Sequence, residues 1–311
     1  MQKRKLGASG PEVSLVGLGT NNFGGRIGRD AARRVVDKAL DLGVTLIDTA
    51  DIYGDKGGSE TILGEVLGSR RKDVVLATKF GLTMGDGKSG GASRRYIAQA
   101  VEASLRRLNT DWIDLYQLHR PDAKTPIEET LRALDDLVKA GKVRCIGCSN
   151  FSAAQLEEAQ SVASRQRLSA FVTCQDEYNL LDRAIEKDRV AVMQRYGLGL
   201  LPYFPLASGL LSGKYRRGAP MPAGSRLSYS AQHADGLLTA ANWAIVDRLA
   251  AFAAERGRSL LELAMSWLAS RPFLSSIIAG ATSPDQVAQN VAAVDWLLSP
   301  ADLAAIDSIT L

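Results

Sequence analysis

The sequence predicts a (β/α)8 TIM barrel, an α/β fold in which eight parallel strands close into a cylinder covered by helices. Three observations carry this prediction. Short apolar runs rich in β-branched residues recur along the chain, which is typical of strands buried on both faces of a parallel sheet. Amphipathic helical patterns lie between these runs. The length of 311 residues suits one such domain, so residues 1–311 are expected to fold as a single unit.

The strands can be followed in chain order. Residues 2–6 and 12–14 flank the turn-forming stretch GASGP and predict a small leading β-hairpin. The runs expected to form the eight barrel strands then follow, at residues 15–19, 44–48, 74–79, 113–119, 143–149, 171–176, 198–204 and 274–280.

The helices are predicted from apolar periodicity and capping residues. Residues 126–140 place apolar side chains on one face, after a capping box of Thr125 and Glu128. An extra C-terminal helix is expected to begin at Ser299. The capping-box spacing, a serine three residues before a Gln or Glu, marks further helix starts at Ser152, Ser259 and Ser283.

A competing architecture is an open doubly wound sheet with a glycine-rich dinucleotide fingerprint. After the first barrel strand, Asn22 stands where that fingerprint requires its third glycine. Residues 85–90 match G-x-G-x-x-G, but they lie in a glycine-rich stretch, 81–93, that we expect to be a mobile loop over one end of the barrel. A second segment, 205–239, is long, has no clear period and is expected to be functional.

Composition limits the classes of function. The net charge is +4 with the basic residues dispersed, so no nucleic-acid partner is expected, although a few cations could neutralise a phosphorylated cofactor. Two histidines, and three cysteines within apolar runs, predict no metal site and reduced, buried thiols in a cytoplasmic protein. No signal peptide and no membrane span of about 20 apolar residues are expected.

Polar residues end nearly every predicted strand. In a (β/α)8 barrel the chemistry lies at the C-terminal ends of the strands, so these residues should face one mouth. In chain order the residues at the strand ends are Gly19, Thr20, Asp48, Lys79, His119, Ser149, Asn150, Gln175, Tyr203 and Gly280.

Four residues make a coherent catalytic set at this mouth. Tyr53 follows the second strand and can fold back over it, and a nearby Lys79 ammonium should lower the phenol pKa from its ordinary value of about 10. Asp48 would keep that ammonium charged, and His119 could hold a substrate oxygen. Taken one at a time, each has a structural alternative, as a turn cap, a strand-end charge, a packed tyrosine or a satisfied histidine.

Several stretches make the chain resemble the aldo-keto reductases over essentially its whole length. They are LIDTADIYG, LATKFG, SLRRLNTDWIDLYQLHRPD, TPIEETLRALDDLVKAGKVRCIGCSNFS, LPYFPLASGLLSGKY and AGATSPDQVAQNV. The central block is similar to the branch that includes the voltage-gated potassium-channel beta subunits.

The resemblance implies an oxidoreductase that uses NADP(H) to reduce aldehydes and ketones to alcohols, or runs the reverse reaction, by hydride transfer. The family's catalytic Asp, Tyr, Lys and His fall on Asp48, Tyr53, Lys79 and His119, with the tyrosine as general acid and base. The channel subunits usually carry asparagine in place of the histidine, so His119 favours turnover.

The resemblance also assigns a cofactor site across the mouth. Ser149, Asn150 and Gln175 would bind the nicotinamide carboxamide. Tyr203 would stack on the ring, and Lys214 and Arg226 would contact phosphates. The other expected contacts are Leu206, Ser208 and Leu210 along the diphosphate, Gly280, Thr282, Gln286, Gln289 and Asn290 around the adenosine, and Gly19, Thr20, Asp48, Phe204 and Pro205.

Departures from the family pattern leave alternatives open. Gln286 stands where many members carry an arginine for the 2′-phosphate, so NADP(H) preference rests on Lys214 and Arg226, and NAD(H) stays possible. Asn21 or Asn22 replaces a common pocket tryptophan, which predicts a more polar substrate pocket. Two rival functions also stay open: a nicotinamide-sensing regulatory module with little turnover, and a Schiff-base lyase with a lysine nucleophile. A homo-oligomer is possible.

Overall fold

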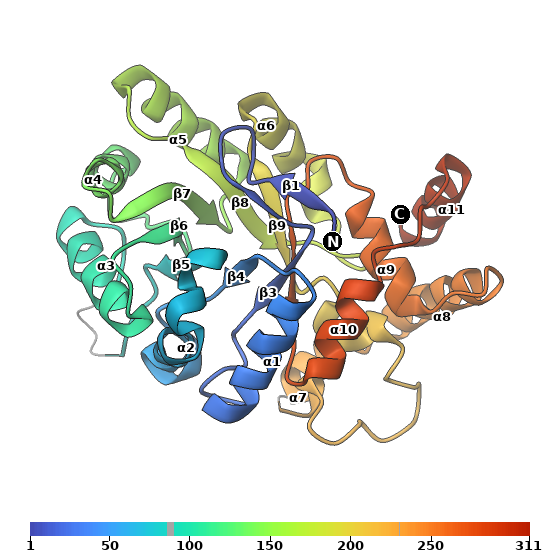
Figure 1. Ribbon diagram of the computed structural model, residues 1–311. Coiled ribbons are helices and arrows are strands. Elements are labelled where there is room, and N and C mark those ends of the chain that lie inside the picture. Colours follow the sequence, from blue (N-terminus) through green and yellow to red (C-terminus); the bar gives the residue numbers. More distant parts are fainter. Residues whose placement is uncertain (86–89, 230) are drawn as a thin grey trace.

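The structure, a computed structural model, describes residues 1–85, 90–229 and 231–311 and has the predicted (β/α)8 barrel (Figure 1). Eight parallel strands are hydrogen-bonded in the order β10-β3-β4-β5-β6-β7-β8-β9. A parallel bridge between Leu200 in β9 and Leu274, just before β10, brings the two edges together. The barrel is therefore nearly closed, which excludes an open doubly wound sheet.

The predicted C-terminal ends of the strands are confirmed to within one residue, because strands buried on both faces need nearly continuous apolar runs. The strands are β3 (Val16–Gly19), β4 (Leu46–Asp48), β5 (Val75–Phe80), β6 (Ile113–Leu118), β7 (Val143–Ser149), β8 (Phe171–Glu177), β9 (Gly199–Tyr203) and β10 (Ile277–Gly280).

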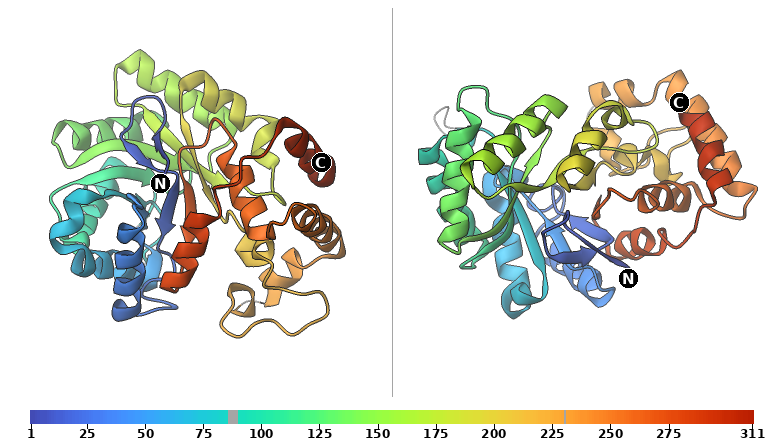
Figure 2. Two further views of the ribbon diagram at one scale, coloured as in Figure 1. Left: turned by 45° about the vertical axis from the view of Figure 1, so that its right-hand side comes forward. Right: turned by 90° about the horizontal axis from the view of Figure 1, so that it is seen from above.

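Helices cover the outside of the strands (Figures 1 and 2). The α-helices are α1 (Arg29–Asp41), α2 (Tyr53–Leu67), α3 (Arg94–Leu108), α4 (Ile127–Lys139), α5 (Ala153–Gln166), α6 (Arg189–Tyr196), α7 (Ala231–Leu237), α8 (Ala240–Ala254), α9 (Leu260–Ala269), α10 (Pro284–Ala292) and the extra C-terminal helix α11 (Pro300–Thr310). The 3-10 helices are η1 (Gly68–Asp73), η2 (Ala184–Lys187), η3 (Ala207–Ser212) and η4 (Arg226–Tyr229).

The leading hairpin is also confirmed. β1 (Lys3–Lys5) and β2 (Glu12–Ser14) pair antiparallel and lie across one end of the barrel (Figure 1). Leu6 and Val13 are fully buried there and pack with apolar side chains from inside the barrel. The hairpin therefore covers the N-terminal ends of the strands, and the chemistry is left to the opposite end.

The capping boxes predicted at Ser152 and Ser259 are confirmed. The box predicted at Thr125 is wrong, because α4 begins after Pro126 without a side-chain cap. Thr125 instead donates its hydroxyl hydrogen to Asp122 at 2.7 Å. Thr125 thus lies one residue before the helix N-cap, and a bond to a charged acceptor, which is stronger than one to a neutral group, holds its side chain toward Asp122.

The long segment 205–239 is more regular than its composition indicates, since it contains η3, η4 and α7. Four residues of the glycine-rich motif at 85–90 lie outside the described part of the chain, and so does part of the loop predicted over 81–93. Among the helices that the structure describes, none is both long enough and apolar enough to cross a bilayer.

Candidate active site

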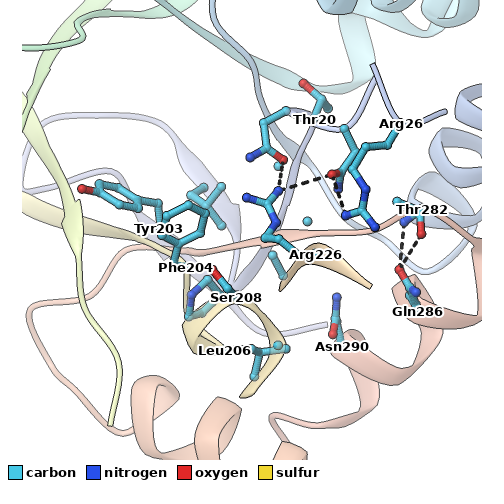
Figure 3. A pocket seen from close by; sticks show the side chains of 18 of the residues that line it. Thr20, Arg26, Tyr203, Phe204, Leu206, Ser208, Arg226, Thr282, Gln286 and Asn290 are labelled. Carbon is cyan, nitrogen blue, oxygen red and sulfur yellow. Dashed lines mark hydrogen bonds between the residues drawn. The ribbon is translucent and has the colours of Figure 1, made fainter. Parts of the chain in front are cut away.

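A cavity of about 700 Å³ lies at the C-terminal ends of the barrel strands (Figure 3). Lys79 lies behind its wall, and the Leu210 side chain is buried in the hydrophobic core, so neither lines it. The other candidate residues line it: Gly19, Thr20, Asp48, Tyr53, His119, Ser149, Asn150, Gln175, Tyr203, Phe204, Pro205, Leu206, Ser208, Lys214, Arg226, Gly280, Thr282, Gln286, Gln289 and Asn290.

A buried ion pair lies beneath the cavity. Lys79 on β5 donates to Oδ2 of Asp48 at 2.7 Å and to the carbonyl oxygen of Thr49 at 2.9 Å. The two charged side chains are only 1% and 3% exposed, so each depends on the other in place of water. Burial lowers the pKa of Lys79, but Asp48 and Tyr53 outweigh it and leave that pKa above its ordinary value. The amine is therefore protonated at neutral pH, which argues against a Schiff-base nucleophile.

Two side-chain amides complete the surroundings of Asp48. Its Oδ1 accepts hydrogen bonds from Nε2 of Gln175 at 2.9 Å and from Nε2 of Gln117 at 3.3 Å. Gln117 was missing from the sequence-based set because it lies within β6 and not at the strand's end. With both oxygens of Asp48 bonded, the buried carboxylate is satisfied.

An unusual turn places Tyr53 at the mouth. Tyr53 begins α2, and residues 54–57 all have positive φ angles, from 57° to 114°, so the right-handed helix continues only after them. Gly54 is required in this turn, because a Cβ there would come within 2.4 Å of the carbonyl oxygen of Phe23. Ser59, fully buried after the turn, bonds the hydroxyl of Thr49 at 2.9 Å. The turn formed by residues 54–57 thus positions Tyr53.

Tyr53 lies close to both the lysine and the histidine. Nζ of Lys79 is 5.1 Å from the centroid of the Tyr53 ring, and the centroid of the His119 ring is 5.8 Å from it in an edge-on arrangement. The expectation of a lowered tyrosine pKa is wrong. Burial raises the pKa of Tyr53 by more than the Lys79 ammonium lowers it. The phenol is therefore protonated at neutral pH, which is the form that can donate a proton.

His119, directly after β6, carries a neutral ring. Burial, followed by the charges of Lys79 and Arg120, lowers the pKa of His119 to about 3. Its Nδ1 is buried and has no hydrogen-bond partner among the residues that the structure describes. Its carbonyl oxygen accepts from Nδ2 of Asn150 at 3.1 Å. A neutral imidazole at this place can offer one N–H to a substrate oxygen.

This histidine predicts a pH dependence of stability. The pKa is 6.5 in an ordinary environment and about 3 in the folded protein, so the unfolded chain binds the proton more readily. Because the folded pKa is depressed, the stability contribution is present above pH 6.5 and is lost as the pH falls from there toward 3. We expect His119→Gln to flatten the fall in unfolding free energy across this window, measured by urea denaturation. A slope equal to that of the wild type would contradict the prediction.

The residues assigned to the nicotinamide form a connected polar edge. Ser149 donates its hydroxyl hydrogen to the carbonyl oxygen of Gln175 at 2.7 Å, and Nδ2 of Asn150 donates to Oγ of Ser149 at 2.9 Å. Tyr203 donates its phenol hydrogen to Oδ1 of Asn150 at 2.8 Å. This edge runs from Asp48 to the aromatic ring of Tyr203 along the ends of β4, β7, β8 and β9.

The residues assigned to the adenosine lie around the N-terminus of α10. Oε1 of Gln286 accepts from the backbone N–H of Thr282 at 2.9 Å, while Ser283 caps the helix. Gln286 therefore stabilises the loop before α10 and does not close the box predicted with Ser283. Asn290 lies further along the same helix and lines the cavity (Figure 3).

Three charged residues of the cavity wall were absent from the sequence-based set: Arg26, Arg120 and Glu177. Glu177 ends β8 and Arg120 follows His119, so the strand-end rule could have found both. Burial raises the pKa of Glu177 to about 7. Arg26 lies in the loop after β3 and carries no such signal, because loop conformation decides where its side chain points.

Comparison with known proteins identifies the family. The model of the aldo/keto reductase family matches residues 15–311. The chain belongs to this family. The resemblance inferred from the sequence motifs is thus confirmed, and this aldo/keto reductase is an oxidoreductase by family.

Relatives of this aldo/keto reductase carry different names. It is 38% identical, over 99% of its length and 96% of the relative, to a probable voltage-gated potassium channel subunit beta from Oryza sativa subsp. japonica. It is 36% identical, over 99% of its length and 96% of the relative, to the uncharacterized oxidoreductase YrpG from Bacillus subtilis. It is 34% identical, over 99% of its length and 92% of the relative, to L-glyceraldehyde 3-phosphate reductase from Escherichia coli K12.

Aldo/keto reductases generally use NADP(H), and the cavity fits a group of that kind. The polar edge of Ser149, Asn150 and Gln175 offers donors and acceptors for a carboxamide. Four cationic side chains line the cavity against two carboxylates, and one of these carboxylates, Asp48, is neutralised by Lys79. A wall with excess positive charge suits a ligand that carries phosphates.

Proposed function

We propose that this protein is an NADP(H)-dependent reductase that converts aldehydes or ketones to alcohols, or runs the reverse reaction. The observation that supports it is the buried Lys79–Asp48 pair beneath a protonated Tyr53. The neutral ring of His119 lies beside the Tyr53 ring in an edge-on arrangement. We further propose that residues 1–311 act as one domain, in the cytoplasm, on small carbonyl or alcohol compounds.

Each of the four residues has a defined task in reduction. The bound cofactor supplies the hydride that adds to the carbonyl carbon. Tyr53 donates its proton to the carbonyl oxygen as negative charge develops there. Lys79 stabilises the phenolate that remains, and Asp48 keeps Lys79 charged. The N–H of His119 holds the same carbonyl oxygen and orients it toward Tyr53.

Similarity to channel beta subunits favours a second candidate, a nicotinamide-sensing protein with little turnover. A single-turnover experiment separates the two. Protein loaded with NADPH is mixed with aldehydes, ketones and aldoses, including glyceraldehyde 3-phosphate, and NADPH absorbance is followed. We expect at least one compound to oxidise the bound NADPH within seconds. NADPH that stays reduced for minutes with the whole panel would favour the sensor.

The preference for NADP(H) predicts an effect at Lys214, which lines the cavity. A lysine on a phosphate contributes about 1.5–3 kcal/mol, or about tenfold or more in affinity. We expect Lys214→Met to raise the Kd of NADPH about tenfold and that of NADH less than twofold, measured by quenching of protein fluorescence. Lys187→Met, an exposed lysine outside the cavity, is the control. Equal weakening of both cofactors would show that Lys214 does not recognise the 2′-phosphate.

A further inference from the structure

Three buried hydroxyl groups form a chain behind the proposed catalytic residues. The hydroxyl oxygen of Ser59, on α2, lies 2.9 Å from that of Thr49, just after β4, and 3.0 Å from that of Thr20, just after β3. The Thr20 hydroxyl donates in turn to the backbone carbonyl oxygen of Asp48 at 2.9 Å. All three hydroxyl-bearing residues are 0% exposed. The chain therefore joins α2 to the ends of two neighbouring barrel strands, away from water.

The hydrogen bonds of this chain all run in one direction. Ser59 has a single hydroxyl hydrogen, which points to Thr20, whose hydroxyl and carbonyl oxygens are both 3.0 Å away. Thr49 therefore donates its own hydroxyl hydrogen to Ser59. Removal of the Ser59 hydroxyl would leave the buried hydroxyl of Thr49 without this acceptor, and an unsatisfied buried donor destabilises the arrangement that contains it.

Both ends of the chain are attached to the segment that holds the Lys79 ammonium. Nζ of Lys79 donates to the carboxylate of Asp48 at 2.7 Å and to the carbonyl oxygen of Thr49 at 2.9 Å. Thr20 bonds the backbone carbonyl of that same Asp48, and the hydroxyl of Thr49 bonds Ser59. The position of Ser59 is thus linked to the position of the ammonium.

The same serine contacts the turn that carries Tyr53. A Cβ on Gly54 would come within 2.6 Å of the backbone nitrogen of Ser59, so the residue next to Tyr53 is packed directly against the serine. Two of the four turn residues, 54–57, are not glycine, and a positive φ is strained for them. The turn therefore depends on contacts outside itself, and Ser59 supplies one of them.

We propose that Ser59 is a positioning residue for the proton transfer, whose hydroxyl chain holds the turn that carries Tyr53 at a fixed distance from the Lys79 ammonium. The inference rests on the proposed function in taking Tyr53 as the acid. Nζ of Lys79 lies 5.1 Å from the centroid of the Tyr53 ring, and its attraction to a phenolate falls as this separation grows. Neither Ser59 nor Thr49 is among the described residues that line the cavity, so these two hydroxyls act through Tyr53 and Lys79.

Single-turnover kinetics test the effect on the reaction. We expect Ser59→Ala to slow the oxidation of bound NADPH by about tenfold or more, because small displacements of reacting groups are costly, while the Kd of NADPH changes less than twofold. Heavy water should slow the variant more than it slows the wild type, since the transfer of the Tyr53 proton then limits the rate to a greater extent.

A second variant tests the hydroxyl chain from its other end. Thr49→Val keeps the size of the side chain and removes the hydroxyl that donates to Ser59, so it should also slow the reaction. The double variant Ser59→Ala/Thr49→Val should be no slower than the slower of the two single variants, because both substitutions remove the same interaction.

Hydrogen exchange tests the position of the turn without any need for turnover. The backbone N–H of Tyr53 donates to the carbonyl oxygen of Ala50 at 3.1 Å at the start of the turn. In Ser59→Ala without cofactor, the backbone amides of residues 53–57 should exchange about tenfold faster than in the wild type, the equivalent of one buried hydrogen bond lost. Mass spectrometry of the peptide that covers these residues gives the rates.

Ser266→Ala is the matched control. Ser266 is 2% exposed on α9, donates its hydroxyl hydrogen to the carbonyl oxygen of Ala293 at 2.8 Å, and is not among the described residues that line the cavity. This variant should lose a similar free energy of unfolding in urea. Its turnover rate, its solvent isotope effect and the exchange of residues 53–57 should match those of the wild type.

Two outcomes would overturn the role of Ser59. The first is exchange of residues 53–57 in Ser59→Ala at the wild-type rate. The second is faster exchange with an unchanged turnover rate and solvent isotope effect, which would leave Ser59 with a role in stability alone. Failure of the reductase function is seen separately, as a wild-type protein that oxidises no NADPH with any compound of the panel. That result would overturn both proposals, whereas either outcome above in an active protein overturns only the role of Ser59.

Discussion

Replacing Tyr53 by phenylalanine is expected to reduce kcat for carbonyl reduction by about 10²–10⁴-fold, the usual contribution of a general acid. The ring would keep its place beside His119 and Lys79, because only the hydroxyl is removed. The Kd of NADPH should change less than twofold. The measurement is steady-state NADPH oxidation with the best aldehyde of the panel, combined with fluorescence titration of the cofactor.

The control for this variant is Tyr196→Phe, the same chemical change at a tyrosine on α6 that donates to Glu157 at 2.6 Å, away from the cavity. Its kcat should equal that of the wild type within a factor of two. A Tyr53→Phe enzyme that keeps most of its turnover would refute the acid role and leave His119 or water as the proton source. A large loss of cofactor affinity would instead show that Tyr53 supports the binding site.

The protonation of Tyr53 also predicts the pH profile of the reduction. Because the acid must be protonated, activity is full below its pKa and falls above it. Burial holds the pKa of Tyr53 above its ordinary value of 10.0 in the protein alone. At saturating substrate, titration of Tyr53 should therefore cause no fall in the reduction rate between neutral pH and a pH just below 10.0.

The direction of the Tyr53 pKa shift could not be predicted from the sequence. The sequence indicates that Lys79 and Tyr53 meet, because strand ends in a parallel barrel converge and the spacing after β4 is short. It does not indicate how deeply the phenol is buried. The energy of removing a phenolate from water competes with its attraction to the ammonium, and only the packing decides which is larger.

In the rest of the site, residues at strand ends could be predicted from the sequence and residues in loops could not. The eight strand ends were predictable because apolar runs stop where side chains reach the mouth, so Asp48, His119 and Gln175 were found in place. Arg26 was not, because it lies in a loop whose course depends on a contact with Gly224, 198 positions away in the chain. Thr125 was misassigned because the helix begins one residue later, after Pro126, and the Thr125 hydroxyl is turned toward Asp122, to which it donates its hydrogen.

The second large effect is expected at the buried ion pair. Lys79→Met removes the charge that stabilises the phenolate of Tyr53, so kcat should fall at least about 10²-fold. It also leaves the carboxylate of Asp48 buried without its cation, which destabilises a protein by about 3–5 kcal/mol. The folded pKa of Lys79 is raised, so this stability is fully present below the ordinary lysine pKa of 10.5 and is lost only as the pH rises through the folded value. Urea denaturation at pH 7 therefore measures the whole effect.

A double variant separates the two roles of the pair. In Lys79→Met/Asp48→Asn no buried charge is left unpaired, and the new amide can still bond the side chain of Gln175, which contacts Asp48 in the wild type. Most of the lost free energy of unfolding should return, to within about 2 kcal/mol of the wild type, because a buried pair replaced on both sides is often neutral. Turnover should stay as low as in Lys79→Met. Lys142→Met, which breaks an exposed pair with Glu102, should change stability by no more than about 1 kcal/mol. If stability and turnover returned together in the double variant, the ion pair would act only by holding the fold and not by stabilising the phenolate of Tyr53.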